Sequence, residues 1–225
     1  MVTPDELKKL IVNSLEEQGF IIEDDQIKLP PDLDKRKIRE LHKMAIQHKI
    51  DNAGIELKRK EKILIQFIAS GKEINPQKIK PCLVEVSPNS LDELLFRYAS
   101  LHWSIPVSSG YGRRLRFLVM DAYHEKLIGL IGLGDPVFSL KARDEWVKWG
   151  HEEKRQRLRY VMDAFVLGAV PPYSYLLCGK LVAMIVASNE VREAFRKKYG
   201  EKRSLIRMKK HDGRLAMITT TSALG

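Results

Sequence analysis

The sequence predicts an α+β protein, in which a helical N-terminal region (residues 1–72) precedes a mixed-sheet α/β domain (residues 80–225). In the first region, apolar side chains recur at helical spacing between glycines and prolines. From residue 80 onward, short apolar runs typical of strands alternate with capped helical segments. Two of these runs are joined by the short link 121–126, which favours a hairpin, and others are separated by helices. Antiparallel and parallel strand pairs are therefore both expected.

Three helices are predicted in residues 1–72. The first begins at a capping box, because Glu6 follows Thr3 by three residues, and it ends before Gly19. The second and third follow the Leu29-Pro30-Pro31 break and the Asn52-Ala53-Gly54 turn. The region is charged throughout and shows no strand pattern, so we expect it to be entirely helical.

The domain from residue 80 is predicted to contain five strands and four helical segments. The last strand starts with an apolar run, so we expect it to lie inside the sheet. It leads into a hydroxyl-rich end typical of an interior segment, so we expect the domain to be truncated at its C-terminus. The predicted strands are 82–86, 116–120, 127–133, 161–170 and 215–220, and the predicted helices are 90–101, 141–160, 174–186 and 190–199.

Composition excludes several classes of protein. The N-terminus lacks the apolar core of a signal peptide, and the longest apolar stretch, 127–133, is far shorter than the ~20 residues that span a bilayer. Cys82 and Cys178 are far apart, and no Cys or His has the spacing of a metal site, so we expect reduced thiols and no metal. The sequence therefore predicts a cytoplasmic protein with no membrane partner.

The charge of the chain favours a polyanionic partner. The formal net charge is +10, and basic proteins gain affinity for nucleic acid by releasing its counterions. Residues 196–214 hold nine Lys and Arg against two acidic residues. This segment is either a solvated loop or a patch that follows phosphates.

The most distinctive local pattern is Gly110, Tyr111, Gly112, Arg113 and Arg114. Glycines allow the backbone to approach a ligand, arginines bind phosphate through two parallel hydrogen bonds, and tyrosine offers a stacking face. The alternative is an ordinary turn before a strand, with solvated arginines. We name these five residues as candidate phosphate-binding residues.

Three candidate catalytic residues surround the predicted strand 161–170. Asp163 interrupts its apolar run, and a buried carboxylate must be either paired in a structural network or used as an acid or base. Tyr173 and Ser174 follow the proline pair that ends the strand. Ser174 either caps the next helix or, with Lys180, helps to hold an anion at its start.

Two strand ends are predicted to form one composite site. Thr221 and Ser222 follow the last strand, and ligands of open sheets gather at the carboxyl ends of parallel strands. We expect Thr221 and Ser222 to face Tyr173 and Ser174 across a shallow cavity, with Asp163 nearer its base.

Five segments carry a resemblance to a known family: 103–114, 127–136, 142–146, 161–180 and 218–225. As a set, with the helical prefix, they resemble the DruA-like family, a domain of unknown function found in Druantia anti-phage systems and as standalone genes. The resemblance implies a prokaryotic antiviral-defence protein that acts on or near DNA, with other defence subunits as partners. Members of the family continue past the segment 218–225, so a site built partly from that continuation would be incomplete here.

A second resemblance, in the order of elements, is to the acyltransferase-like fold of the GNAT superfamily, which phage Mom-like DNA-modification proteins share. It implies group transfer to nucleic acid. Acetyltransferases of this fold hold the cofactor with an Arg/Gln-x-x-Gly-x-Gly/Ala loop, and the matching residues 172–180 have one glycine and no such pattern. The cofactor therefore stays unassigned, and the alternative function is that of a non-catalytic nucleic-acid-binding or scaffold subunit.

Overall fold

The computed structural model describes residues 3–17, 20–24, 26–28, 34–103, 112–203, 210 and 212–220. The chain divides into two compact units. The first, which we call the helical unit, consists of residues 1–60 and 101–106. The second, the sheet unit, consists of residues 61–100 and 107–225.

The helical unit holds the predicted helices and one element that the sequence did not predict. The capping box is confirmed, since the Thr3 N–H donates to Glu6 Oε2 at 2.8 Å and the Glu6 N–H donates to Thr3 Oγ1 at 3.3 Å. A short antiparallel hairpin contradicts the expectation of helices alone. The elements are α1 (Pro4–Glu17), β1 (Ile21–Glu23), β2 (Gln26–Lys28), α2 (Lys35–Asp51) and the first part of α3 (Ile55–Leu64).

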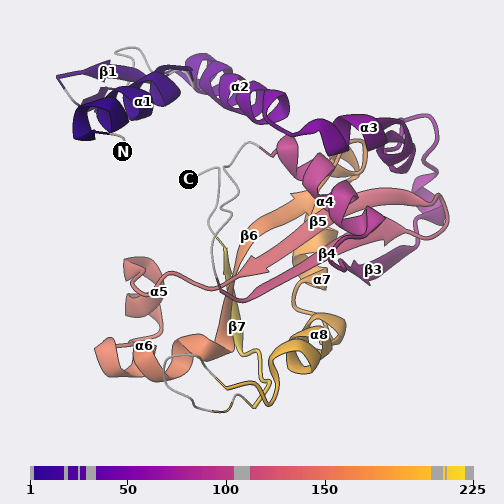
Figure 1. The fold of residues 1–225 in the computed structure, drawn as a ribbon. Coiled ribbons are helices and arrows are strands. Elements are labelled where there is room, and N and C mark those ends of the chain that lie inside the picture. The colour runs from indigo at the N-terminus through magenta and orange to yellow at the C-terminus, as the bar shows by residue number, and fades with distance from the viewer. Residues whose placement is uncertain are drawn as a thin grey trace. The chain divides into compact units, whose positions relative to one another are not determined.

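The sheet unit is built on a mixed sheet of five strands in the order β3-β4-β5-β6-β7 (Figure 1). The first four strands run antiparallel to their neighbours and β7 runs parallel to β6, which confirms the mixed sheet. The prediction that the last strand is an inner one is wrong, because β7 ends the order of the described strands. The strands are β3 (Pro81–Glu85), β4 (Arg114–Asp121), β5 (Lys126–Gly134), β6 (Val161–Ala169) and β7 (Met217–Thr220).

The helices of the sheet unit differ from the predicted ones at breaks in the backbone. The predicted helix 141–160 is two short helices, because Lys148 between them takes a left-handed conformation with φ +56°. The predicted helix 174–186 starts late for the same reason, since Leu177 has φ +60°. Ser188 occupies the cap position of the helix that was predicted over 190–199. The helices are α4 (Leu91–Leu101), α5 (Lys141–Trp146), α6 (His151–Arg157), α7 (Cys178–Ile185) and α8 (Asn189–Tyr199).

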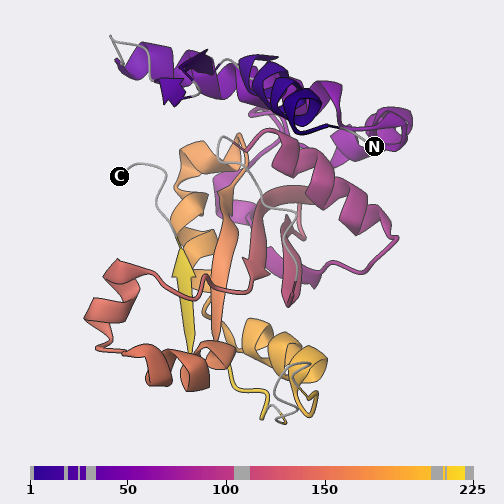
Figure 2. The same ribbon diagram turned by 60° about the vertical axis from the view of Figure 1, so that its left-hand side comes forward.

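The main core lies between the sheet and the pair α7 and α8, and α4 covers the other face of the sheet (Figures 1 and 2). Phe117 and Ile131 of the sheet are buried with Val182 of α7 and Phe195 of α8. Within the described residues, no helix has both the length and the apolar composition needed to cross a membrane.

Gly129 allows α7 to pack closely on the sheet. A Cβ atom there would overlap the carbonyl oxygen of Gly168, and it would lie 2.8 Å from Val182 Cγ2 and 3.0 Å from Ala169 Cα. Gly168 and Ala169 belong to β6, and Val182 is buried in the core. A side chain at position 129 would therefore disturb the pairing of β5 with β6 and push α7 away from the sheet.

We predict that Gly129→Ala lowers the free energy of unfolding by about 1–3 kcal/mol, the usual cost of overpacking a core. Gly179→Ala is the control, because Gly179 lies in α7 with no atom within 4 Å of the added Cβ. That change should be neutral or stabilise the protein by up to about 1 kcal/mol, since alanine favours helix. Urea unfolding measures both. Equal effects of the two substitutions would contradict the close packing.

Candidate functional site

The predicted site residues separate into two groups along β6. Asp163 is the third residue of β6, opposite Gly134 of β5, whereas Tyr173 comes four residues after the strand ends at Ala169. At about 3.3 Å per residue, Asp163 and the end of β6 are about 20 Å apart. The structure therefore places Asp163 with the start of β6 and Tyr173 with its far end.

The residues near Asp163 form what we call the sheet-face cluster: Arg114, Asp163, Phe165 and Thr219. Thr219 stands opposite Asp163 in the parallel pair of β6 and β7, and its hydroxyl donates to Asp163 Oδ1 at 2.7 Å. Arg114 begins β4, and its guanidinium lies 4.5 Å from the centre of the Phe165 ring. The cluster draws its residues from three of the five sequence segments that carry the family resemblance, 103–114, 161–180 and 218–225.

The glycines of β5 make room for the Phe165 ring. A Cβ atom on Gly132 would lie 2.7 Å from Phe165 Cε2, and one on Gly134 would lie 3.3 Å from Phe165 Cδ1. The ring occupies this space because a β-bulge shifts the register between β5 and β6 at Gly132 and Leu133. The glycine pattern of 127–134 therefore serves packing, and through it supports Arg114.

The sheet-face cluster combines the guanidinium of Arg114, which lies on the Phe165 ring, with the half-buried carboxylate of Asp163. Burial lowers the pKa of Arg114, neighbouring Arg116 lowers it further, and Asp135 opposes both. The Nε atom of Arg114 is buried without a hydrogen-bond partner in the described part of the chain. A guanidinium on an aromatic ring can hold an anion or a planar polar group, and a carboxylate can accept a proton from one.

Arg113, by contrast, holds the fold together. Its backbone N–H and its Nε donate to the two oxygens of Asp135 at 2.8 and 2.6 Å. Its remaining guanidinium nitrogens donate to three backbone carbonyls just before and at the start of β6, those of Leu158, Arg159 and Val161. These bonds engage all three of its guanidinium nitrogens, so Arg113 fits a structural role better than the predicted phosphate-binding one.

The approach of Asp135 to Arg113 also explains why residue 112 is a glycine. It has φ +102°, and a Cβ atom there would overlap the carboxylate of Asp135. Its glycine character therefore serves the turn and the approach of Asp135. The other candidates Gly110, Tyr111, Thr221 and Ser222 lie outside the described residues.

Tyr173 belongs to a buried cluster at the other end of the sheet, which we call the Asp121 cluster: Asp121, His124 and Tyr173. The Tyr173 hydroxyl donates to Asp121 Oδ2 at 2.8 Å, and both residues are fully buried. His124 Nδ1 lies 2.6 Å from the same oxygen, and its Nε2 accepts the Asn75 N–H at 3.1 Å. Nδ1 therefore carries the proton that binds Asp121. The N–H groups of Lys80 and Tyr123 donate to the other oxygen.

The hydrogen bonds of the Asp121 cluster keep Asp121 ionised and Tyr173 protonated. Burial raises the pKa of Asp121, but the bonds from Lys80, His124, Tyr173 and Tyr123 outweigh it and hold the pKa below its usual value. Burial, and then the neighbouring carboxylate, raise the pKa of Tyr173 well above that of a free tyrosine. Tyr173 therefore stays protonated as a donor, which fits a structural role better than the predicted catalytic one.

Ser174 and Lys180 are exposed near the start of α7. The expectation that Ser174 caps this helix is wrong. Ser174 lies within a 3-10 turn, Tyr173–Leu176, and the cap position of α7 is Leu177, which makes no side-chain cap bond. Neither Ser174 nor Lys180 is brought to the sheet-face cluster.

A groove with a cavity volume of about 460 Å³ lies beside α8, and we call it the α8 groove. Arg192 and Arg196 of α8 line it together with Arg214 from the segment before β7. The sequence had indicated 196–214 as basic but missed Arg192. Arg192 and Arg196 share one exposed helix face, next to the face of Val191 and Phe195, and this four-residue spacing is the signal that a helical plot of the sequence would have shown.

Sequence reasoning also missed Asp121, Asp135 and Phe165. Asp121 ends an apolar strand and precedes His124 by three residues, a pattern that suggests a paired carboxylate. Nothing local to Asp135 or Phe165 identifies their partners. Within the described residues, no group of three or more His, Cys, Asp or Glu side chains is placed to hold a metal ion.

Comparisons with known proteins place the chain beside one family. Residues 32–225 match the family described as Druantia protein DruA. Druantia protein DruA of Escherichia coli (strain UMEA 4076-1) is 44% identical over 219 residues, an alignment that covers 97% of this chain and 54% of that relative. The chain thus spans about half the length of the curated relative. No solved structure matches it.

We predict that Tyr173→Phe lowers the free energy of unfolding by about 1–3 kcal/mol at neutral pH, because the mutant leaves a buried carboxylate short of one donor. A carboxylate whose folded pKa is depressed stabilises the fold above its unfolded pKa of about 3.9, and loses that contribution as the pH falls. The deficit of the mutant should therefore shrink below about pH 4. Urea unfolding at several pH values measures it.

Tyr175→Phe is the matched control, since Tyr175 is 81% exposed two residues away. It should leave stability unchanged at every pH. A Tyr173→Phe protein as stable as the control would show that the hydrogen bond to Asp121 contributes nothing.

Proposed function

Because the chain belongs to the DruA family, we propose that it acts in anti-phage defence and does so on or near DNA. The defence role follows from the family. Because the chain spans about half of the length of the curated relative, the defence role of this chain is a proposal. Contact with DNA is supported by an observation on this chain itself.

That observation is the division of charge between the two units. Residues 1–60 hold 12 Lys and Arg and 12 Asp and Glu, and residues 101–106 hold none of these four types. The sheet unit holds 27 Lys and Arg and 17 Asp and Glu. The whole excess of +10 therefore belongs to the sheet unit. A concentrated excess favours a polyanion more strongly than the same charge spread over the chain.

A second candidate is group transfer to DNA, favoured by the strand order. Four antiparallel strands are followed by a parallel fifth, and α7 and α8 connect β6 to β7. This order supports the proposal of a GNAT-like layout, although fold alone does not assign chemistry. The sheet-face cluster adds a carboxylate, Asp163, and a cation, Arg114, that such a reaction would use.

The alternative is a non-catalytic nucleic-acid-binding or scaffold subunit. It requires only the basic surface of the sheet unit and leaves the sheet-face cluster with a structural role. The two candidates share DNA contact and differ in whether a small-molecule donor binds near Arg114. Other defence-system subunits are proposed partners of either.

We predict that the full chain binds labelled duplex DNA, with an affinity that falls steeply between about 50 and about 200 mM salt. Each phosphate contact contributes about −0.9 to the slope of log K against log salt. Fluorescence anisotropy measures this slope. Arg36→Gln, an exposed change in the helical unit, should leave it unaltered. Binding that is absent at low salt, or indifferent to salt, would refute the proposal.

We also predict that the purified chain carries a small molecule if group transfer is its activity. Arg114→Ala and Asp163→Asn should each reduce the bound amount about tenfold or more, since a hydrogen bond to a charged group contributes about 1.5–3 kcal/mol. Mass spectrometry of the denatured protein detects the molecule, and Lys141→Ala, at an exposed position of α5, is the control. If no molecule is found, the result would favour a non-catalytic nucleic-acid-binding or scaffold subunit.

A further inference from the structure

We propose that the α8 groove binds the phosphate backbone of a nucleic acid, with Arg192, Arg196 and Arg214 as its phosphate contacts. The inference rests on the proposed function and names the surface that contacts DNA. The groove is separate from the sheet-face cluster, which contributes none of its lining residues.

The position of α8 is fixed by its apolar face. Val191 and Phe195 are fully buried against the sheet, so the side chains on the other side of the helix point away from the core. Arg192 and Arg196 are four residues apart, which places them on one helix face with about 6 Å of rise between them. Arg214 belongs to the segment 213–216 that lines the groove with them.

The three arginines have few competing partners. Within the described residues, the side chain of Arg192 makes one hydrogen bond, to the neutral Asn189 Oδ1 at 3.3 Å. Arg214 Nε lies 3.8 Å from Asp212 Oδ2, and with its side chain 83% exposed this is a weak, screened pair. Arg196 has no ion pair within the described residues. Their guanidinium groups can therefore accept a ligand without first breaking a strong bond.

The surroundings add to the positive charge. From Arg192 to Arg214 the described residues include eight Lys and Arg and three acidic residues. They therefore carry +5 of the net charge of +10. A polyanion approaching the sheet unit would be attracted to this side of it.

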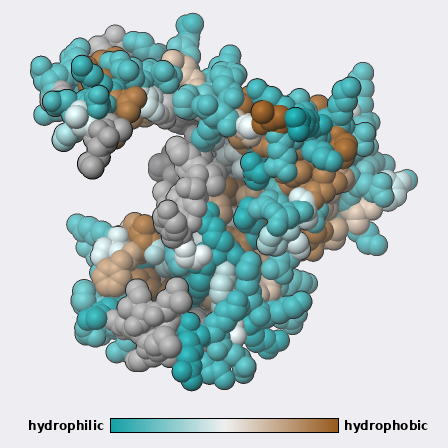
Figure 3. All heavy atoms as spheres, in the orientation of Figure 1, coloured by the Kyte–Doolittle hydropathy of each residue, from teal (hydrophilic) through white to brown (hydrophobic). Residues whose placement is uncertain are grey.

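The surface favours nucleic acid over an anionic membrane. Membrane-binding helices insert large apolar side chains below the headgroups. Among the described residues from 189 to 220, no large hydrophobic side chain is exposed. Figure 3 shows the same hydrophilic character over α8. Arginine also suits phosphodiesters, because its planar group donates two parallel hydrogen bonds.

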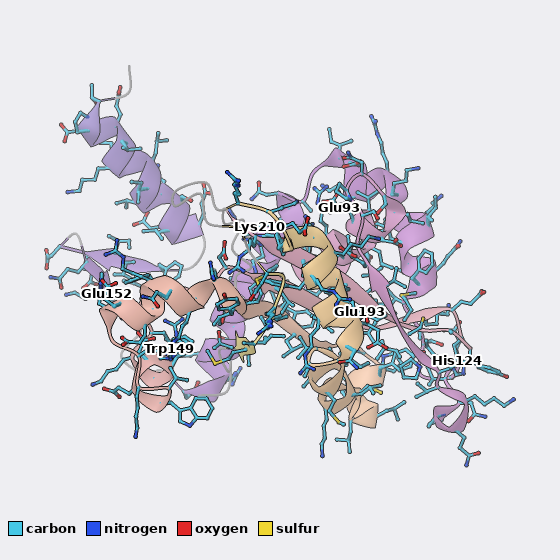
Figure 4. The ribbon with its side chains drawn as sticks, turned by 90° about the horizontal axis from the view of Figure 1, so that it is seen from below. Glu93, His124, Trp149, Glu152, Glu193 and Lys210 are labelled. Atoms are coloured by element: carbon cyan, nitrogen blue, oxygen red, sulfur yellow. The ribbon has the colours of Figure 1, made fainter. Side chains whose placement is uncertain are left out.

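One acidic side chain shares the groove and makes the inference easy to test. Glu193 of α8 lines the same cavity, and Figure 4 shows it on that helix. It has no ion pair among the described residues, so its charge is available to repel a phosphate. Removing that charge should strengthen binding if phosphate enters the groove, the opposite of the effect of removing an arginine.

The first experiment compares the wild-type chain with the triple variant Arg192→Gln, Arg196→Gln, Arg214→Gln by anisotropy with labelled duplex DNA. Glutamine keeps the Cγ carbon of Arg196, which packs against Gly213. The slope of log K against log salt should fall by about 2.7 for three lost contacts, so the affinity loss between about 50 and about 200 mM salt becomes about 40-fold smaller. Thermal melts check that the variant is folded.

The second experiment measures Glu193→Gln, which should bind DNA more tightly than wild type at low salt. Glu145→Gln, an exposed change in α5, is the control and should bind as wild type does. Unchanged salt slopes in the triple variant, or weaker binding by Glu193→Gln, would overturn the inference while leaving DNA binding by the chain intact. A wild-type chain that does not bind DNA would instead refute the proposed function.

The third experiment uses vesicles of phosphatidylcholine and phosphatidylserine. If the groove is a nucleic-acid surface, the wild-type and triple-variant chains should show the same weak vesicle binding. Vesicle binding that is lost in the triple variant, together with DNA binding that is unchanged, would assign the groove to a membrane and overturn the inference.

Discussion

The carboxylate of Asp121 joins three stretches of the sheet unit that are far apart in sequence. It accepts hydrogen bonds from Lys80 at the edge of β3, from Tyr123 and His124 in the β4–β5 turn, and from Tyr173 beyond β6. A buried charge without such partners would cost several kcal/mol, so none of these segments can move without exposing or orphaning it. The placement of α7 depends on this cluster, because the turn that contains Tyr173 leads directly into the helix.

Much of the sheet unit could be predicted because its strands follow local rules. Apolar runs and the short hairpin link indicated four of the five strands closely. The predicted helix 90–101 begins where Ser90 Oγ accepts the Glu93 N–H at 3.2 Å. The predicted helix boundaries are wrong where the backbone conformation of a single residue interrupts a helix. Leu177 and Lys148 take left-handed conformations that are rare for residues with a side chain, and tertiary contacts, not composition, select them.

The candidate site could be predicted only in part, as two adjacent arginines illustrate. Neighbouring residues in extended backbone point to opposite sides, so Arg113 turns toward Asp135 and the carbonyls near Val161 while Arg114 turns toward Phe165. The sequence shows that both are present but not which acid or ring each will meet. Tyr173 presents the same difficulty, because its partner Asp121 is 52 residues away. In Figure 4, His124 of that cluster lies on the opposite side of the unit from Trp149 and Glu152.

The sheet-face cluster and the α8 groove, the two surfaces proposed to act in function, are connected through the side chain of Tyr199. The Tyr199 hydroxyl at the end of α8 accepts the N–H of Arg114 at 2.6 Å and donates to the carbonyl of Arg114 at 2.8 Å. Arg196 of the α8 groove is one helical turn from Tyr199, and Arg114 belongs to the sheet-face cluster. Loss of the Tyr199 hydroxyl would remove a partner from both the N–H and the carbonyl of Arg114, so a change at the end of α8 would disturb the backbone that carries the sheet-face cluster.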